Sequence, residues 1–201
     1  MHPRRLACFL LGTWLGASIL LSAVAAYNFQ TVDEVLLAAP EPARKMLQAI
    51  GQAQARQLLR HHAAEANRNY FEAWELAQLP LGLALLTTLA LNKASRLQIA
   101  LSAIMLVSVV VARFLLTPEL TGVGRMLDFE APSVAVALLK HRFAAFHRMY
   151  GAVELIKLSS GVLLTGLLLY RSVGSRKRRR SDLREQVDAV HDADNRHVDR
   201  G

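Results

Sequence analysis

Cysteine is nearly absent from the sequence, because Cys8 is the only one in 201 residues. A single cysteine excludes an internal disulfide and any metal site built from several thiolates. The short motifs of nucleophilic, phosphate and zinc-protease chemistry are missing as well: no G-x-S-x-G elbow, phosphate-binding glycine loop or H-E-x-x-H pair occurs. We therefore predict no catalytic residue, no metal site and no cofactor.

Charged residues are also scarce, at 20% of the chain against 53% for hydrophobic residues. A soluble domain carries about a quarter of charged residues. Apolar runs of roughly twenty residues, the length that spans a bilayer as a helix, lie at about 6–26, 71–91, 97–116 and 152–170. The sequence thus predicts an all-α integral membrane protein, a four-helix transmembrane bundle whose membrane domain covers residues 1–171.

The first apolar run has two interpretations. Arg4 and Arg5 before it and the small residues Ala23-Val24-Ala25 near its end are typical of a cleavable signal peptide. The run is longer than the about 7–15 apolar residues of such peptides, and its Gly12-x-x-x-Gly16 spacing lets membrane helices pack closely. We expect the segment to stay attached; the alternative is a secreted helical protein released by cleavage.

Lysine and arginine gather at alternate ends of the apolar runs. They precede the first run, fill the turn between the second and third, and follow the fourth: Arg4, Arg5, Lys93, Arg96, Arg171 and the basic run that follows it. Such residues concentrate in cytoplasmic loops. We therefore expect a multi-pass protein of the cell membrane, in a bacterial inner membrane, with both termini in the cytoplasm.

The chain after the fourth run predicts a disordered, basic cytoplasmic tail over 172–201, because it has few large apolar residues. Its basic run can bind anionic lipid headgroups and consists of Arg176, Lys177, Arg178, Arg179 and Arg180. Nucleic acid is an alternative ligand for such a run, but its position beside a span favours lipid. The expected partners are membrane lipids and a second copy of the chain in a homo-oligomer, with no nucleic acid.

A short internal repeat lies at the start of the second and fourth runs. Ala73–Gly82 (AWELAQLPLG) matches Ala152–Gly161 (AVELIKLSSG) at the first, third, fourth, seventh and tenth positions. The match continues through Leu85/Leu164 and Leu89/Leu168. A repeat of this kind predicts two related hairpins, arranged about a pseudo-two-fold axis along the membrane normal. It would bring Glu75 and Glu154 toward one another.

Ionisable residues inside spans are costly and mark functional sites. With this topology they share one level near the outer membrane face: Glu72, Glu75, Gln78, Arg113, His147, Glu154 and Lys157. Glu154 and Lys157 are three residues apart and can pair on one helix face, and we expect Arg113 to pair with Glu75 or Glu154.

This polar cluster has three interpretations. It can be a salt-bridge layer that fixes helix register, or a proton- or cation-binding site in a transport or assembly protein. The third is a membrane-bound redox or metal-dependent enzyme that uses Glu75, Glu154 and His147. Di-metal bundle sites need the Glu-x-x-His motif twice, whereas the order is reversed in His62-x-x-Glu65, next to His61.

The connections on the outer side predict helical extensions. Residues 43–78 contain no proline and favour a continuous helix that runs into the second span. The second connection should break at Pro118 and become helical again from Ser133, a plausible N-cap. Trp14 and Tyr150 read as packing or interfacial aromatics.

Several short motifs resemble the transmembrane-protein-205-like family of four-span proteins, a domain of unknown function in bacteria. They are Ala112-Arg113-Phe114-Leu115 with Pro118 soon after, Phe143-x-x-Phe146-His147, Ser160-Gly161 with Gly166-Leu167, and Trp14-Leu15-Gly16. The resemblance implies a four-helix integral membrane fold. A role in exporting toxic metal drugs, suggested for eukaryotic relatives, would favour sulfur ligands, of which the chain has Cys8 and five methionines.

Overall fold

The computed structural model describes residues 3–129 and 133–198, with side chains placed as far as residue 170. These residues form helices and no strand. Four helical stretches are long and apolar enough to cross a membrane: α1 (Pro3–Leu37), α3 (Gln52–Leu91), the stretch Arg96–Leu127, and α6 over Val134–Tyr170. The protein therefore has the architecture of a helical, multi-pass membrane protein.

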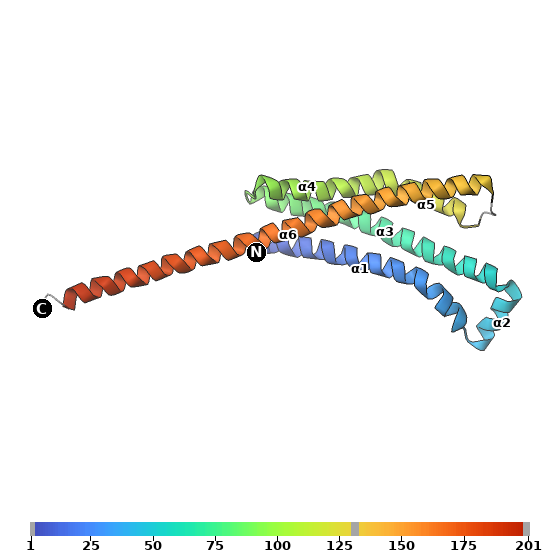
Figure 1. The fold of residues 1–201 in the computed structure, drawn as a ribbon, viewed down its shortest axis with the longest axis horizontal. Helices are drawn as coiled ribbons and strands as arrows, with labels where there is room; N and C mark the ends of the chain where they lie inside the picture. The colour runs from blue at the N-terminus through green and yellow to red at the C-terminus, as the bar shows by residue number, and fades with distance from the viewer. Residues whose placement is uncertain (1–2, 130–132, 199–201) are drawn as a thin grey trace.

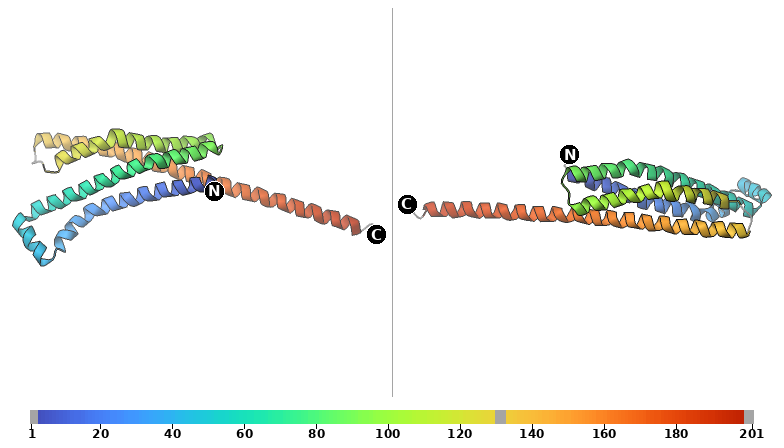
Figure 2. Two further views of the ribbon diagram at one scale, coloured as in Figure 1. Left: turned by 180° about the vertical axis from the view of Figure 1, so that it is seen from behind. Right: turned by 90° about the horizontal axis from the view of Figure 1, so that it is seen from above.

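The four long stretches form one elongated bundle in which each is antiparallel to its neighbours (Figures 1 and 2). Helix α1 packs on α3, α3 on α4 (Arg96–Val111), α4 on α6, and α6 closes the ring against α1. The N-terminus and the α3–α4 turn lie together at what we call the turn end. Helix α2 (Glu41–Ile50) and the connection from α5 (Thr117–Leu127) to α6 lie at the other end, the extension end.

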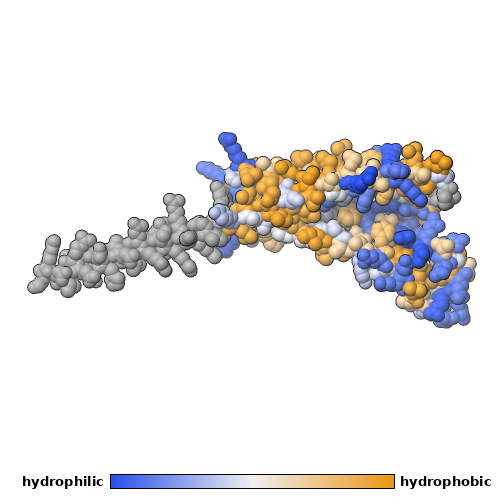
Figure 3. Space-filling model, in the orientation of Figure 1, coloured by the Kyte–Doolittle hydropathy of each residue, from blue (hydrophilic) through white to orange (hydrophobic). Residues whose placement is uncertain are grey.

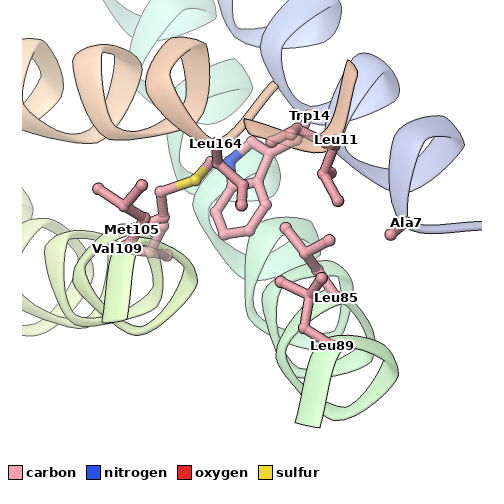
Figure 4. Packing of buried hydrophobic residues seen from close by; sticks show 10 residues of the cluster. Ala7, Leu11, Trp14, Leu85, Leu89, Met105, Val109 and Leu164 are labelled. Atoms are coloured by element: carbon pink, nitrogen blue, oxygen red, sulfur yellow. The ribbon is translucent and has the colours of Figure 1, made fainter. Parts of the chain in front are cut away.

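The apolar core lies near the turn end, since its members Leu89 and Leu101 stand close to either side of the α3–α4 turn. Figure 4 shows how its side chains pack. The core draws on α1, α3, α4 and α6, with these buried members: Ala7, Leu11, Trp14, Leu85, Leu89, Leu101, Met105, Val109, Leu164 and Leu168. Figure 3 shows hydrophobic residues over the middle of the bundle surface and hydrophilic ones gathered around α2. An apolar outer surface around a packed core is what a lipid-facing bundle requires.

Two glycines let α1 approach the helices on either side of it. A Cβ atom added at Gly82 would lie 2.7 Å from the Trp14 ring, and one at Gly161 would lie 2.7 Å from the Leu15 side chain. Small residues at such contacts are the usual means of close packing in membranes. Gly12 and Gly16 do not provide such a contact within the described chain, because a Cβ at either would meet nothing within 4 Å.

At the extension end the α1–α3 hairpin stays closed by polar contacts. Asn28 Nδ2 donates to Asn67 Oδ1 at 2.7 Å, and Asn67 Nδ2 donates to the Ala25 carbonyl at 2.9 Å. The pair α5–α6 diverges from this hairpin (Figure 1). The bundle is therefore tightly packed in its middle and split into two arms at the extension end.

Two helix boundaries differ from those predicted. The expected helix over 43–78 is interrupted at Gly51, whose φ of 93° is a left-handed conformation that glycine adopts without steric cost. The third span does not break at Pro118 but continues through a π-helical segment, η1 (Ala112–Leu116), into α5. Pro118 lies in the first turn of α5, where a missing N–H is tolerated, and the wider π turn precedes it.

Helix α6 begins where the sequence indicates and ends later than expected. The Val136 amide donates to the Ser133 hydroxyl at 3.2 Å, so Ser133 caps the helix as predicted. The backbone of α6 is helical from Val134 to Val198, whereas the sequence predicts a disordered tail from residue 172. Residues 171–198 contain one glycine and no proline, so nothing in the composition breaks the helix. The basic run Arg176–Arg180 lies beyond the described side chains.

Candidate functional site

Seven polar side chains, buried or half-buried, gather between the apolar core and the extension end of the bundle. We call this set the polar layer, and its members are Trp14, Glu75, Gln78, Thr117, Tyr150, Glu154 and Lys157. They come from α1, α3, α5 and α6. All four walls of the bundle therefore contribute to one site.

One half of the polar layer surrounds Lys157, which is 1% exposed. Its Nζ donates to Glu154 Oε1 at 2.6 Å and to Gln78 Oε1 at 2.7 Å. Trp14 Nε1 donates to the same Gln78 oxygen at 2.6 Å. The Glu154–Lys157 pair predicted from spacing is thus present, and it gives the buried ammonium a counter-charge.

The other half surrounds Glu75, which is also 1% exposed. Its Oε1 accepts from the Thr117 hydroxyl at 2.7 Å and from the Tyr150 hydroxyl at 2.9 Å. Its Oε2 is buried and has no hydrogen-bond partner among the described residues. Arg113 interacts with Glu75 only through its charge, and the predicted ion pair of Arg113 with Glu75 or Glu154 is not among the ion pairs of the described residues.

Glu75 is therefore a buried carboxyl group that receives hydrogen bonds from neutral hydroxyls alone. Burying a charge without an ion partner is expensive. The described hydrogen bonds satisfy one of its two oxygens and leave the other unsatisfied. Among the described residues, Glu75 Oε2 and the Ser102 hydroxyl are the buried side-chain atoms without a hydrogen-bond partner, and of these two residues only Glu75 is ionisable. Its carboxyl group lies between three spans.

Three predicted members of the cluster lie outside this layer: Arg113, described above, Glu72 and His147. Glu72 is half-buried and its Oε1 accepts from the Thr121 hydroxyl at 3.3 Å. His147 is exposed and stacks on the Phe143 ring of its own helix, with a centroid distance of 5.9 Å. His147, Glu75 and Glu154 do not form a possible metal site. Among the described residues, one group of three possible metal ligands lies within 4.8 Å of one another, and it contains none of these three. The geometry therefore gives no support to the predicted alternative of a metal enzyme on these three residues.

That group belongs to a second polar set at the extension end, which we call the outer clasp. Its members are His61, Glu65, Arg68, Arg125 and Asp128. Arg125 donates to both Glu65 oxygens at 2.9 Å, and Arg68 bonds Asp128 at 2.9 Å. The Arg125 hydrogen bonds, assisted by Arg68, hold the pKa of Glu65 at about 2. The clasp ties α3 to α5 through charge-assisted hydrogen bonds.

The sequence missed several members of both sets. Thr117 and Tyr150 donate the hydrogen bonds to Glu75. The spacing could have placed Tyr150 in the cluster, because it precedes Glu154 by four residues, one helical turn. Of the suggested metal ligands, His61 and Glu65 meet Asp128, whereas His62 is exposed elsewhere on α3. In the clasp, the carboxylates of Glu65 and Asp128 are bonded to arginines.

No protein-family model, no curated protein and no solved structure matches the sequence. The likeness to the transmembrane-protein-205-like family stays a prediction from its motifs.

Proposed function

We propose that this multi-pass membrane protein binds and releases a proton at Glu75, as part of a transport or assembly function in the membrane. The observation that carries the proposal is the Oε2 atom of Glu75, which is fully buried without a hydrogen-bond partner. Ionisable residues inside spans serve in proton and ion pathways.

The contacts of Glu75 suit both of its protonation states. Thr117 and Tyr150 both donate to Oε1, so a proton can occupy Oε2 without breaking either bond. The protonated form is neutral and avoids the cost of a buried charge. Proton exchange at Glu75 therefore needs no rearrangement of its described partners.

The proposal includes a symmetric origin for the site. At the repeat offset, Gln78 corresponds to Lys157, Gly82 to Gly161 and Leu85 to Leu164, and all of these are buried in their helices. Gln78 and Lys157 also contact one another. Residues near a two-fold axis meet their own equivalents, so this contact supports two hairpins related by an axis that passes through the polar layer. Transporter sites occur at such repeat interfaces.

We further propose that the turn end faces the cytoplasm. Arg5, Lys93 and Arg96 are exposed there, and Arg4 donates to the Leu168 carbonyl beside them. Basic residues next to spans favour the cytoplasmic side. The polar layer then lies toward the outer face, with the outer clasp beyond it.

Infrared spectroscopy of the protein in liposomes tests the proton site. The carboxylic-acid band should change with pH in the wild type and lose a component in Glu75→Gln. Glu72→Gln removes a neighbouring glutamate of the same helix and should keep that component. Proton flux into vesicles that contain a pH-sensitive dye should fall in Glu75→Gln and persist in Glu72→Gln.

An unchanged band and an unchanged flux in Glu75→Gln would limit the polar layer to holding helix register. Folding of each variant is checked by size-exclusion chromatography in detergent. If Glu75→Gln does not fold, Tyr150→Phe serves instead, because it removes one donor to Glu75 and should shift the midpoint of the band without removing the carboxyl group.

A further inference from the structure

A cavity of about 430 Å³ lies where the two arms of the bundle diverge. Its lining comes from α1, α3, α5 and α6, and we call it the outer cleft. Figure 3 shows a hydrophilic hollow between the two arms at the extension end. Its volume falls within the range of small-molecule sites, about 300–1,000 Å³.

The α3 wall of the outer cleft is basic. Arg56, Arg60 and Arg68 line it at spacings of four and eight residues, about one and two helical turns, so they lie on one side of α3. His61, seven residues before Arg68, lines the cleft beside them. A helix face turned toward neighbouring helices is normally apolar. Here it presents guanidinium groups to a space that the protein does not fill.

These arginines differ in how their charge is compensated. Arg68 is tied into the outer clasp, and Arg56 pairs with Asp33 at 2.7 Å, where both side chains are more than half exposed. Arg60 forms no ion pair with any described residue and is exposed at the cleft. The cleft therefore has an unneutralised cationic group, next to a second one whose pairing is weak in water.

The opposite side of the outer cleft is apolar. Phe29 from α1, Leu127 from α5 and Phe143 from α6 line it, and the one carboxylate of the lining, Asp128, is bonded to Arg68 and His61. Arg68 lies about 5 Å beyond the predicted start of the second span and Arg60 about 16 Å beyond it, at 1.5 Å per helical residue. The cleft thus extends from the level of the lipid headgroups into water.

We propose that the outer cleft binds an anionic amphiphile, a molecule with an apolar body that ends in a carboxylate or phosphate. Arg60, with Arg56, binds the anionic group, because guanidinium groups match carboxylate and phosphate oxygens. Phe29 and Phe143 contact the apolar body. A purely inorganic anion would leave the aromatic wall uncovered, and a cation would face the arginines.

A cysteine-protection experiment tests this site in the full chain. Ala64 lines the cleft and is half-buried, so Ala64→Cys in a Cys8→Ala background places one reactive thiol beside the ligand. The protein is reconstituted in phosphatidylcholine nanodiscs, and the rate of maleimide labelling is measured with octyl phosphate. At ten times its Kd, octyl phosphate should slow labelling about tenfold, because mass action leaves about a tenth of the sites open.

Matched ligands separate the two halves of the proposal. Inorganic phosphate, octyltrimethylammonium and octyl glucoside should each protect poorly, since each lacks the apolar body or the negative charge. Equal protection by octyl glucoside, or none by octyl phosphate, would overturn the proposal. Equal protection by inorganic phosphate would overturn the role of the apolar wall.

Matched variants assign the anionic group to its arginines. Arg60→Gln should raise the protecting concentration about tenfold, the loss expected for one charge-assisted hydrogen bond, and Arg56→Gln should raise it less. Arg44→Gln is the control, because Arg44 lies on α2 outside the cleft and pairs there with Glu41. Unchanged protection in the double variant of Arg56 and Arg60 would overturn the assignment.

A separate measurement identifies the source of the ligand. Nanodiscs that contain phosphatidylglycerol, with no added ligand, should slow labelling if a membrane lipid enters the cleft. No slowing there, together with protection by octyl phosphate, assigns the site to a soluble amphiphile, and both results support the site. Glu75→Gln leaves the cleft intact, so failure of the proton proposal would not change these outcomes.

Discussion

Glu65 and Glu75 lie ten residues apart on helix α3, and their carboxyl groups have opposite surroundings. Glu65 is bonded to two arginines in the outer clasp, outside the predicted span. Glu75 is bonded to two neutral hydroxyls inside it and keeps one oxygen without a partner. A guanidinium partner stabilises the charged form and fixes it, whereas hydroxyl partners allow a carboxyl group to change its charge.

The largest expected effect comes from removing the hydroxyls around Glu75. The double variant Thr117→Val and Tyr150→Phe leaves the buried carboxyl group with no described donor, at a cost of about 1–3 kcal/mol for each lost partner. Thermal unfolding in detergent should show a clear drop in the midpoint. Thr121→Val, which removes only the 3.3 Å bond to Glu72, is the control and should change little. Equal losses of stability in the double variant and in Thr121→Val would contradict the larger role given to the donors of Glu75.

A smaller loss is expected when the outer clasp loses its central cation. Arg68 is 14% exposed and bonds both Glu65 and Asp128, so Arg68→Gln should cost about 1–3 kcal/mol for the partners left unsatisfied. A spin-label distance between α3 and α5 should broaden in this variant. An unchanged distance distribution would show that the clasp does not hold α5 in place.

The pH dependence of the clasp follows from Glu65. Its pKa is lowered from 4.5 to about 2, so its contribution to stability is complete above pH 4.5 and is lost as pH falls toward 2. The same spin-label distance should therefore broaden across that window in the wild type and much less in Glu65→Gln. A wild-type distance that stays constant down to pH 2 would contradict this account.

The smallest effect is expected for Arg125→Gln. The Arg125 side chain is 56% exposed, and water screens exposed ion pairs so that they contribute little to stability. The midpoint of thermal unfolding of the variant in detergent should lie close to that of the wild type and above that of Arg68→Gln. A larger drop than for Arg68→Gln would reverse the order proposed within the clasp.

The membrane architecture could be predicted because hydropathy over twenty residues needs no knowledge of packing. The Glu154–Lys157 contact could be predicted too, since both residues belong to one helix. The partners of Glu75 could not, because Thr117 and Tyr150 belong to other helices whose rotation about their axes is set by packing. The same limit explains why the sequence predicted an ion pair of Arg113 with Glu75 or Glu154 that the described residues do not form.

The π segment is a second reason why the sequence did not predict the partners of Glu75. It inserts a wider turn over Ala112–Leu116, which changes the face that later residues present. Hydropathy does not register that change, and proline rules indicated a break at Pro118 instead. At Gly51 the sequence held the signal, since it is the one glycine between residues 43 and 78.

The contact between Gln78 and Lys157 has a consequence for how such a bundle can be encoded. On the proposed axis, two identical hairpins would have to place the same residue at both positions. Two lysines would bring like charges together, and two glutamines would leave Glu154 without its ammonium partner. On that axis, an acceptor can face a cation only when the two proposed halves differ at this position. A chain whose halves differ can therefore hold the Lys157 ammonium against the Gln78 oxygen inside the polar layer, which two identical hairpins could not do.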